Sequence, residues 1–385
     1  MLRGAVEPDA TPPPTAADLR AAFGAAAPLT VGIEEEAMLL DRVTLDLCPR
    51  AFEVLSVAPA DLRFKAELPA AQLEVVTDPA PHVTTAVAAL AAGRRDLAAL
   101  ANGIGRVGAA AVHPFAAVEG ELSRGPRYAF SRAEYGAVGR LQVVGALQVH
   151  VAVGGAERSL AVYNALRSHL PELAALAANG AWFAGRDSGF ASVRPKLSEL
   201  LPRQGVPPVL ASWEALADAY AWGVRAGAMP SERLWWWELR PHPAHGTLEV
   251  RVPDAQATVA DAAAVAAVAQ ALVAWLAERW DAGEPLPVAE TWRIEANRWS
   301  AARRGLDGTL ADLVTGEPVP TRDRLRAVLA ALAPTADRLG SGPWLREAAR
   351  LVEANGAVRQ RMAAAGGGGA RAVAAWLADA YLEGC

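Results

Sequence analysis

The segment from residue 29 to residue 40 constrains the fold most, because it places three consecutive glutamates inside an apolar run. It reads LTVGIEEEAMLL. The flanking apolar residues indicate a largely buried strand, and side chains in a strand alternate between its two faces. Glu34 and Glu36 therefore share one face, while Glu35 points to the other. Two carboxylates on one face repel each other unless a cation or a basic group lies between them. An edge strand with a solvated acidic face is the alternative.

A second pair of glutamates follows closely in the chain. Glu67 and Glu74 flank Pro69, and Glu74 lies inside the apolar run 73–76. Glu74 taken alone is also compatible with an ordinary outward-facing strand residue. Carboxylate oxygens are the ligands that hard divalent cations take in proteins, so the four glutamates together favour a Mg²⁺ site.

Two later segments alternate in the same way and carry polar residues on one face. The segment 147–151 presents Gln148 and His150, and the segment 247–252 presents Glu249 and Arg251. A carboxylate beside a guanidinium is commonly a structural ion pair. The same pair can also bind a metal and hold a phosphate or a carboxylate in a bidentate way. Arg240, on the expected preceding strand, adds a second positive group if the two strands pair.

Other candidate motifs are less specific. The loop 182–194 is rich in glycine, serine and arginine, and it fits an active-site loop and a surface loop equally well. His113, His242 and His245 are not accompanied by cysteines or by a His-Glu-x-x-His motif, so they do not indicate a zinc site. The sequence has no P-loop, and the glycines at 103–108 follow an expected helix, where they indicate a helix end.

The pattern along the chain predicts an α+β protein. We expect strands at 29–40, near 63–65 and 72–77, and at 109–112, 141–153, 234–240 and 247–252. We expect helices at 84–106, 157–177, 210–226, 256–282, 288–304, 321–333, 341–354 and 370–382. A further helix is expected to start at Ser131, which forms a capping-box pattern with Glu134. Strands concentrate before residue 253 and helices dominate afterwards, which is not the strict alternation of βαβ units.

Composition and charge argue against several classes of protein function. The net charge of −5 argues against a general nucleic-acid binder, which usually carries a basic face. The two cysteines, Cys48 and Cys385, cannot form a metal cluster, and we expect reduced thiols in the cytoplasm. The N-terminal region lacks the apolar core of a signal peptide. The apolar stretch 262–277 is shorter than the roughly 20 residues that span a bilayer, so a buried helix is expected and no membrane.

Taken together, these residues resemble the bacterial carboxylate–amine ligase family called glutamate–cysteine ligase type 2. The matching segments occur in family order over residues 29–310, and each alone is weak. They are 31–36, 113–115, 127–128, 145–151, 189–192 with Arg194, 240–241, 246–251, 297–299 and 302–303.

The resemblance implies a glutamine synthetase-like antiparallel catalytic sheet flanked by helices, with a helical C-terminal third. It implies ATP and Mg²⁺ as cofactors, an amino acid and an amine as substrates, an acyl-phosphate intermediate, and a homodimer. The implied metal ligands are Glu34, Glu36, Glu67, Glu74, Gln148 and Glu249. Arg240 and Arg251 would hold the phosphates and the intermediate, Arg194 would help to bind ATP, and His150 would lie near the transferred phosphoryl group.

Two departures leave the activity open. The family tends to have Ser-Ser near the position of Asn179-Gly180 in this chain. The family usually has His-Val-His where this chain has Gln148-Val149-His150, and the neutral amide oxygen is a weaker ligand for the cation. Three readings therefore remain: a glutamate–cysteine ligase with full or weakened activity, a substrate-shifted or non-catalytic relative, and another ATP-using phosphotransferase on the same sheet. We expect a flexible Ala/Pro-rich segment at 1–27, a catalytic domain at 28–310 and a helical extension packed on it at 311–385.

Overall fold

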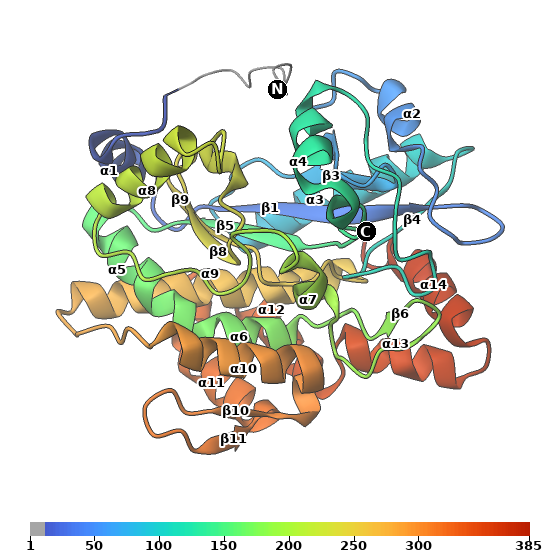
Figure 1. Ribbon diagram of the computed structural model, residues 1–385. Coiled ribbons are helices and arrows are strands. Elements are labelled where there is room, and N and C mark those ends of the chain that lie inside the picture. Colours follow the sequence, from blue (N-terminus) through green and yellow to red (C-terminus); the bar gives the residue numbers. More distant parts are fainter. Residues whose placement is uncertain (1–11) are drawn as a thin grey trace.

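A mostly antiparallel sheet forms the centre of the molecule. The computed structural model describes residues 12–385. Its main sheet runs in the order β2-β3-β1-β5-β9-β8, and β4 pairs with the far end of β1 (Figure 1). The strands are β1 (Val31–Leu40), β2 (Phe64–Ala66), β3 (Gln72–Val76), β4 (Arg106–Gly108), β5 (Leu147–Ala152), β8 (Leu239–His242) and β9 (Thr247–Val250). The α+β class expected from the sequence is confirmed.

The acidic strand β1 lies inside this sheet and pairs with neighbours on both sides. Glu34 and Glu36 of β1 stand opposite Val76 and Glu74 of β3, and Glu34 also faces Gln148 of β5. The acidic strand is therefore not an edge strand, and both of its faces need neighbours.

The back face of the sheet is the main apolar core. The fully buried Val31, Ile33, Leu73, Val149 and Val151 point to this face, where α3 (Val83–Ala101) and α9 (Val259–Asp281) cover them. Helix α9 runs alongside the sheet in Figure 1 and is long and apolar enough to cross a membrane, but 89% of its apolar window is buried in the protein. The prediction of a buried helix at residues 262–277 is confirmed.

Further helices extend this core. They are α1 (Ala16–Ala25), α2 (Ala51–Ser56), α4 (Ala129–Arg140), α5 (Ala156–Leu166), α6 (Leu170–Leu176), α7 (Arg194–Ser198), α8 (Trp213–Arg225), α10 (Thr291–Arg304), α11 (Thr321–Arg338), α12 (Gly342–Glu353), α13 (Gly356–Ala365) and α14 (Gly369–Ala380). Helices α11 and α12 pack on α9, and α14 packs on β4 and on Met38 and Leu40 of β1. Two short hairpins, β6–β7 (Trp182–Phe183, Arg186–Asp187) and β10–β11 (Thr309–Ala311, Pro318–Pro320), were not expected from the sequence.

Several expected boundaries are wrong for identifiable reasons. The helix expected to reach residue 106 ends at Ala101, because Gly103 adopts a left-handed conformation. The strand expected at 109–112 lies instead at Arg106–Gly108. The helix expected at 157–177 breaks at 167–169, just before Pro171, which has no N–H for a continuing helix.

Three further expectations differ from the structure. The strand expected at 141–153 is confined to β5, because Gly145 lies against the backbone of Ala110, where a Cβ atom would come within 2.5 Å of the carbonyl oxygen. The strand expected at 234–240 begins only at Leu239 and follows a short 3-10 turn. Helix α4 begins at Ala129, before the expected capping residue Ser131, and has no side-chain cap.

The N-terminal segment expected to be flexible contains an ordered helix. Residues 1–11 lie outside the described residues, but α1 is capped by Thr15, whose hydroxyl accepts a hydrogen bond from the Asp18 backbone N–H in a capping box. Leu19 and Phe23 are fully buried, and Phe23 packs on Trp213 of α8 with ring centroids 4.7 Å apart. Two apolar side chains at helical spacing thus fix a segment whose alanine and proline content suggested flexibility. The division of the rest of the chain at residue 310 stays a prediction.

A buried ion pair joins the sheet to the helices behind it. Glu35 of β1 and Arg94 of α3 have no exposed side-chain surface, and Arg94 donates to both carboxylate oxygens at 2.6 and 2.7 Å. The guanidinium of Arg94 also donates to the carbonyl oxygens of Gln256, Ala257 and Tyr381. One guanidinium therefore connects β1, the start of α9 and the C-terminal end of the chain.

Substituting Arg94 tests how much the Glu35–Arg94 pair contributes to the stability of the fold. Arg94→Met leaves Glu35 buried without its partner, so the free energy of unfolding should fall by about 3–5 kcal/mol. Urea denaturation followed by circular dichroism measures the change. The control is Arg326→Met, which breaks the exposed pair with Glu353 and should cost less than about 1 kcal/mol. Equal losses in the two variants would contradict a central role for Arg94.

Candidate active site

The register of the strands gathers the polar residues on the front face of the sheet. Directly opposed residues of an antiparallel pair share a face. Nearly all of the residues expected at the site therefore lie on one face, as the alternation along the strands predicts. The opposed pairs are Lys65 with Glu74, Glu74 with Glu36, Glu34 with Gln148, His150 with Glu249, and Glu249 with Arg240.

Several carboxylates share a single ammonium group at one end of this face. The Lys65 Nζ lies 3.1 Å from Glu74 and 3.8 Å from Glu34. The Glu74 side chain is only 5% exposed. Burial raises the pKa of Glu74 well above its ordinary value, and the charges of Glu67 and Glu34 raise it further. The carboxylates here exceed the positive charge of Lys65, so an added cation would stabilise the cluster.

Glu36 is held by hydrogen bonds from three directions. Its Oε2 accepts from Gln72 Nε2 at 3.0 Å and from the Ala146 backbone N–H at 2.8 Å, and its Oε1 accepts from Gln148 Nε2 at 3.1 Å. Burial raises the pKa of Glu36, while the nearby charges of Arg194 and Arg251 oppose the rise. The carboxylate is thus fixed in orientation before any ligand binds.

Glu249 lies between two guanidinium groups at the other end of the face. Arg240 and Arg251 both donate hydrogen bonds to its carboxylate. Its side chain is 1% exposed. Burial alone would raise the pKa of Glu249, but Arg240 and Arg251 outweigh it and hold the pKa well below its ordinary value. This carboxylate is therefore ionised, and each arginine is held close to the sheet.

Gln148 joins the two ends of the site. Its Nε2 donates to Glu36, and its Oε1 accepts from Arg251 Nη1 at 2.5 Å. Since one partner is an acceptor and the other a donor, the orientation of the amide is determined. The oxygen expected to bind metal is therefore engaged with Arg251, and metal binding by Gln148 stays a prediction.

His242 and His245 lie beside His150, and only His150 was expected at the site. His150 Nδ1 lies 3.0 Å from Thr247 Oγ1, and His150 Nε2 is buried, 3.7 Å from Glu34, with no hydrogen-bond partner among the described residues. Burial lowers the pKa of His150. The rings of His242 and His245 stack at 4.4 Å, and both rings contact His150 edge-on. The hairpin register, which places His242 opposite Thr247, is the signal that could have found them.

Arg194 holds the backbone that follows β9. Its guanidinium donates to the carbonyl oxygens of residues 251–253 at 2.7–3.3 Å. It also lies 3.7 Å from Asp254, which accepts from Ser192 Oγ and from the Asn179 backbone N–H. Burial raises the pKa of Asp254 to about 6. The loop 182–194 thus reaches the site through Arg194, which acts in this geometry as a positioning residue for Arg251.

The described part of the chain contains no ready-made metal cluster. Within residues 12–385, no three histidine, cysteine or carboxylate side chains are grouped closely enough to hold a metal ion. Lys65, Arg240 and Arg251 neutralise only part of the carboxylate charge. The donor atoms are nevertheless carboxylate oxygens with an excess of negative charge, which is the ligand chemistry of a hard divalent cation.

An antiparallel sheet with carboxylates and guanidinium groups on one face fits enzymes that transfer phosphoryl groups, where catalysis is mostly positioning and charge neutralisation. Within that class, the chain belongs to glutamate–cysteine ligase family 2, whose model matches residues 30–373. The resemblance stated from the sequence is confirmed, and with it the enzyme class of a carbon–nitrogen ligase.

Individual relatives agree with this membership. A protein of Rubrobacter xylanophilus, named provisionally as glutamate–cysteine ligase 2-3, is 38% identical over 364 residues, covering 93% of this chain and 98% of its own length. The glutamate–cysteine ligase of Francisella tularensis, solved in complex with AMP, has a TM-score of 0.67 at 11% identity and covers 92% of this chain and 88% of its own. A bifunctional glutathione synthetase from Pasteurella multocida has a TM-score of 0.65 at 14% identity, covering 95% of this chain and 53% of its own. The two solved structures support the fold.

Arg194→Lys tests the positioning role. Lysine keeps the charge but cannot reach three carbonyl oxygens, so Arg251 should shift and kcat should fall by about 100-fold, with little change in KM for ATP. Steady-state ADP release measures both constants. The control is Arg186→Lys, in an exposed part of the same loop, which should change neither. A rise in KM for ATP without a fall in kcat would instead favour direct ATP binding by Arg194.

Proposed function

We propose that this protein ligates a carboxylate to an amine at the expense of ATP, through an acyl-phosphate intermediate. The observation that carries the proposal is the single sheet face on which Glu249 lies between Arg240 and Arg251, beside the carboxylates of Glu34, Glu36 and Glu74. Glutamate and cysteine are the substrates named for the relatives, and we take them as the default donor and acceptor.

The acidic residues would hold Mg²⁺. Their oxygens fit a hard cation, and the excess of negative charge around Glu74 supports binding. A bound Mg²⁺ would neutralise phosphate charge during transfer. The proposed ligands are Glu34, Glu36, Glu67, Glu74 and Glu249, with Gln148 as a further ligand if Arg251 releases its oxygen.

The basic residues would bind the phosphate groups. Arg240 and Arg251 are both placed by Glu249, and a guanidinium suits bidentate contact with phosphate or carboxylate. We propose that they hold the γ-phosphate and then the acyl phosphate. The buried His150 Nε2, which has no protein partner among the described residues, would form a hydrogen bond to the transferred group.

The reaction then balances in two steps. A carboxylate oxygen of the donor attacks the γ-phosphorus, the bond to the bridging oxygen breaks, and ADP leaves. The amine nitrogen next attacks the acyl carbon, phosphate leaves with the bonding electron pair, and the nitrogen loses a proton to water. The arginines of the front face would stabilise the phosphate charge in both steps.

A substrate-shifted or non-catalytic relative is the second candidate. Gln148 favours it, because the family usually has histidine at this position. The complete set of glutamates and arginines on the front face favours catalysis. A homodimer and a cytoplasmic location remain predictions.

The proposal is tested by ADP and phosphate release with Mg-ATP and glutamate, with and without cysteine, and then with a panel of amines. Release should require an amine. Glu34→Ala and Arg251→Ala should each lower kcat by about 100-fold or more, because each removes charge stabilisation of the transferring group. The control is Glu353→Ala on the exposed surface, which should be neutral. Release of ADP without any amine, or no binding of ATP, would overturn the proposal.

The cation site has its own test. Binding of Mn²⁺ in the absence of ATP is measured by electron paramagnetic resonance, and EDTA should remove both the bound ion and the activity. Glu74→Gln should weaken Mn²⁺ binding by at least about tenfold, because it removes a carboxylate from the cluster. The control is Glu119→Gln, whose carboxylate pairs with Arg140 on the surface. Equal affinity in the two variants would exclude Glu74 as a ligand.

A further inference from the structure

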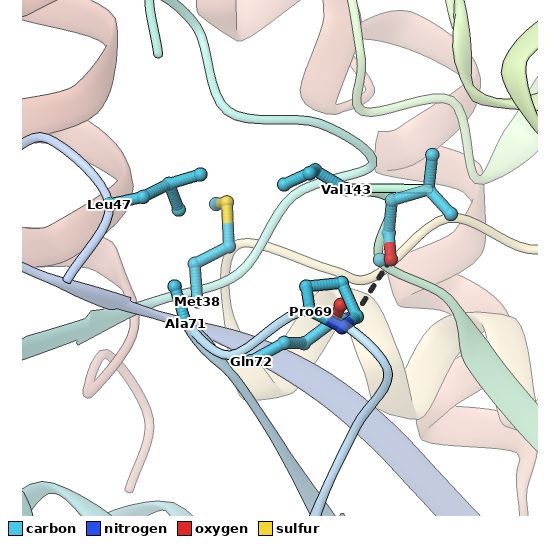
Figure 2. A pocket seen from close by; sticks show the side chains of 8 residues that line it. Met38, Leu47, Pro69, Ala71, Gln72 and Val143 are labelled. Atoms are coloured by element: carbon cyan, nitrogen blue, oxygen red, sulfur yellow. Dashed lines mark hydrogen bonds between the residues drawn. The ribbon is translucent and has the colours of Figure 1, made fainter. Parts of the chain in front are cut away.

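The two ends of the front face are held in different ways. At the carboxylate end, Gln72 Nε2 donates to Glu36 and to the Val144 carbonyl oxygen at 2.8 Å (Figure 2). The hollow beside Met38 and Gln72 has a volume of about 10 Å³, which is room for about one water. Gln72 therefore has little space to turn into, and a neutral side chain fixes this end of the face.

The arginine end carries a further carboxylate, Glu238, which directly precedes β8. Its carbonyl oxygen accepts a hydrogen bond from the Arg251 backbone N–H at 2.7 Å. Leu239 and Val250 are the last register pair of β8 and β9 on this side. One further step along both strands places Glu238 opposite Arg251, and opposed residues of an antiparallel pair share a face. The Glu238 side chain is 7% exposed, so its charge needs a partner.

Arg298 of α10 occupies both oxygens of this carboxylate. Its Nε and Nη2 each donate to one oxygen of Glu238 at 2.6 Å, which is the bidentate geometry of a strong charge-assisted pair. The Arg298 side chain is only 3% exposed. Its Nη1 donates to Glu199, which follows the last residue of α7. Arg298 is therefore committed to two carboxylates and joins α10 to α7 and to the start of β8.

The neutralisation of Glu238 matters for Arg251. Arg251 donates to Glu249 and to Gln148, which directs its guanidinium toward the middle of the front face. A buried carboxylate without a cation attracts a neighbouring guanidinium strongly, because charges interact more strongly away from water. An unpaired Glu238 would compete with Glu249 for Arg251 and draw the guanidinium away from Gln148.

We propose that Arg298 is a positioning residue for the reaction, because it neutralises Glu238 and so keeps Arg251 directed into the site. Arg298 acts through Glu238 and Arg251. This inference rests on the proposed function, in which Arg251 holds the phosphate groups. It also gives a role to the segment 297–299, which is one of the segments that match the family.

The test measures kcat and KM for ATP by amine-dependent ADP release. Arg298→Met leaves Glu238 without its cation, so Arg251 should turn toward Glu238 and kcat should fall by about 100-fold, with KM for ATP changed by less than about threefold. The double variant Glu238→Gln/Arg298→Met removes the competing charge as well, so kcat should return to within about fivefold of the wild-type value.

The matched control is Arg304→Met, which makes the same change at an exposed position of α10 and should leave both constants unchanged. In the Arg251→Ala background, Arg298→Met should have little further effect on kcat, because it acts through Arg251. A double variant no more active than Arg298→Met would overturn the inference, since an arginine that only ties α10 to the sheet is lost equally in both.

A second substitution keeps the test decisive if Arg298→Met does not fold by circular dichroism. Arg298→Lys keeps the charge but cannot occupy both oxygens of Glu238, so kcat should fall by about tenfold and recover when Glu238→Gln is added. Failure to recover would overturn the inference while the ligase proposal stands. Absence of any amine-dependent product in the wild-type protein would instead overturn the proposed function.

Discussion

Three consecutive carboxylates in the central strand are the constraint on which this structure depends. A strand inside a sheet that is covered by helices has little contact with solvent, so each carboxylate of β1 needs compensation from a neighbouring element. On the back face, Arg94 compensates Glu35 completely and in doing so joins α3, the start of α9 and the C-terminal end of the chain. On the front face, Glu34 shares the positive charge of Lys65 with Glu74, and Glu36 is held by hydrogen bonds. The alternation of a strand thus separates a structural charge from charges that remain available for chemistry.

The front face differs from the back in how its charges are satisfied. Lys65 serves Glu74 and Glu34 together, whereas two arginines converge on Glu249. Negative charge is therefore in excess at the β3 end and positive charge at the β8–β9 end. The cation proposed for this site and the phosphate groups carry the complementary charges, so this polarity gives each a preferred end without any movement of the sheet.

Much of this face could be predicted from the sequence, because a period of two assigns side chains to faces without knowledge of the rest of the fold. That argument grouped Glu34 with Glu36, Gln148 with His150, and Glu249 with Arg251. It could not find the partners of Arg94, which are the Glu35 carboxylate and three backbone carbonyl oxygens. It also could not find those of Arg194, which are the carbonyl oxygens of residues 251–253. These partners lie far from each arginine in the chain. Local signals were weaker still: the capping pattern at Ser131 was overridden by a helix that begins earlier, and two buried residues fixed an N-terminal segment of flexible composition.

Gln148 shows how a departure from the family pattern can fit this arrangement. Its amide presents a donor to Glu36 and an acceptor to Arg251, so it links the negative and positive ends of the face through a neutral group. A protonated imidazole has two donors and no acceptor, and it could not serve Arg251 in this way. An amide also keeps the same pattern at every pH, whereas an imidazole changes it near neutrality. The glutamine therefore fixes the orientation of both Glu36 and Arg251 through one neutral group, and this part of the site keeps its geometry at every pH.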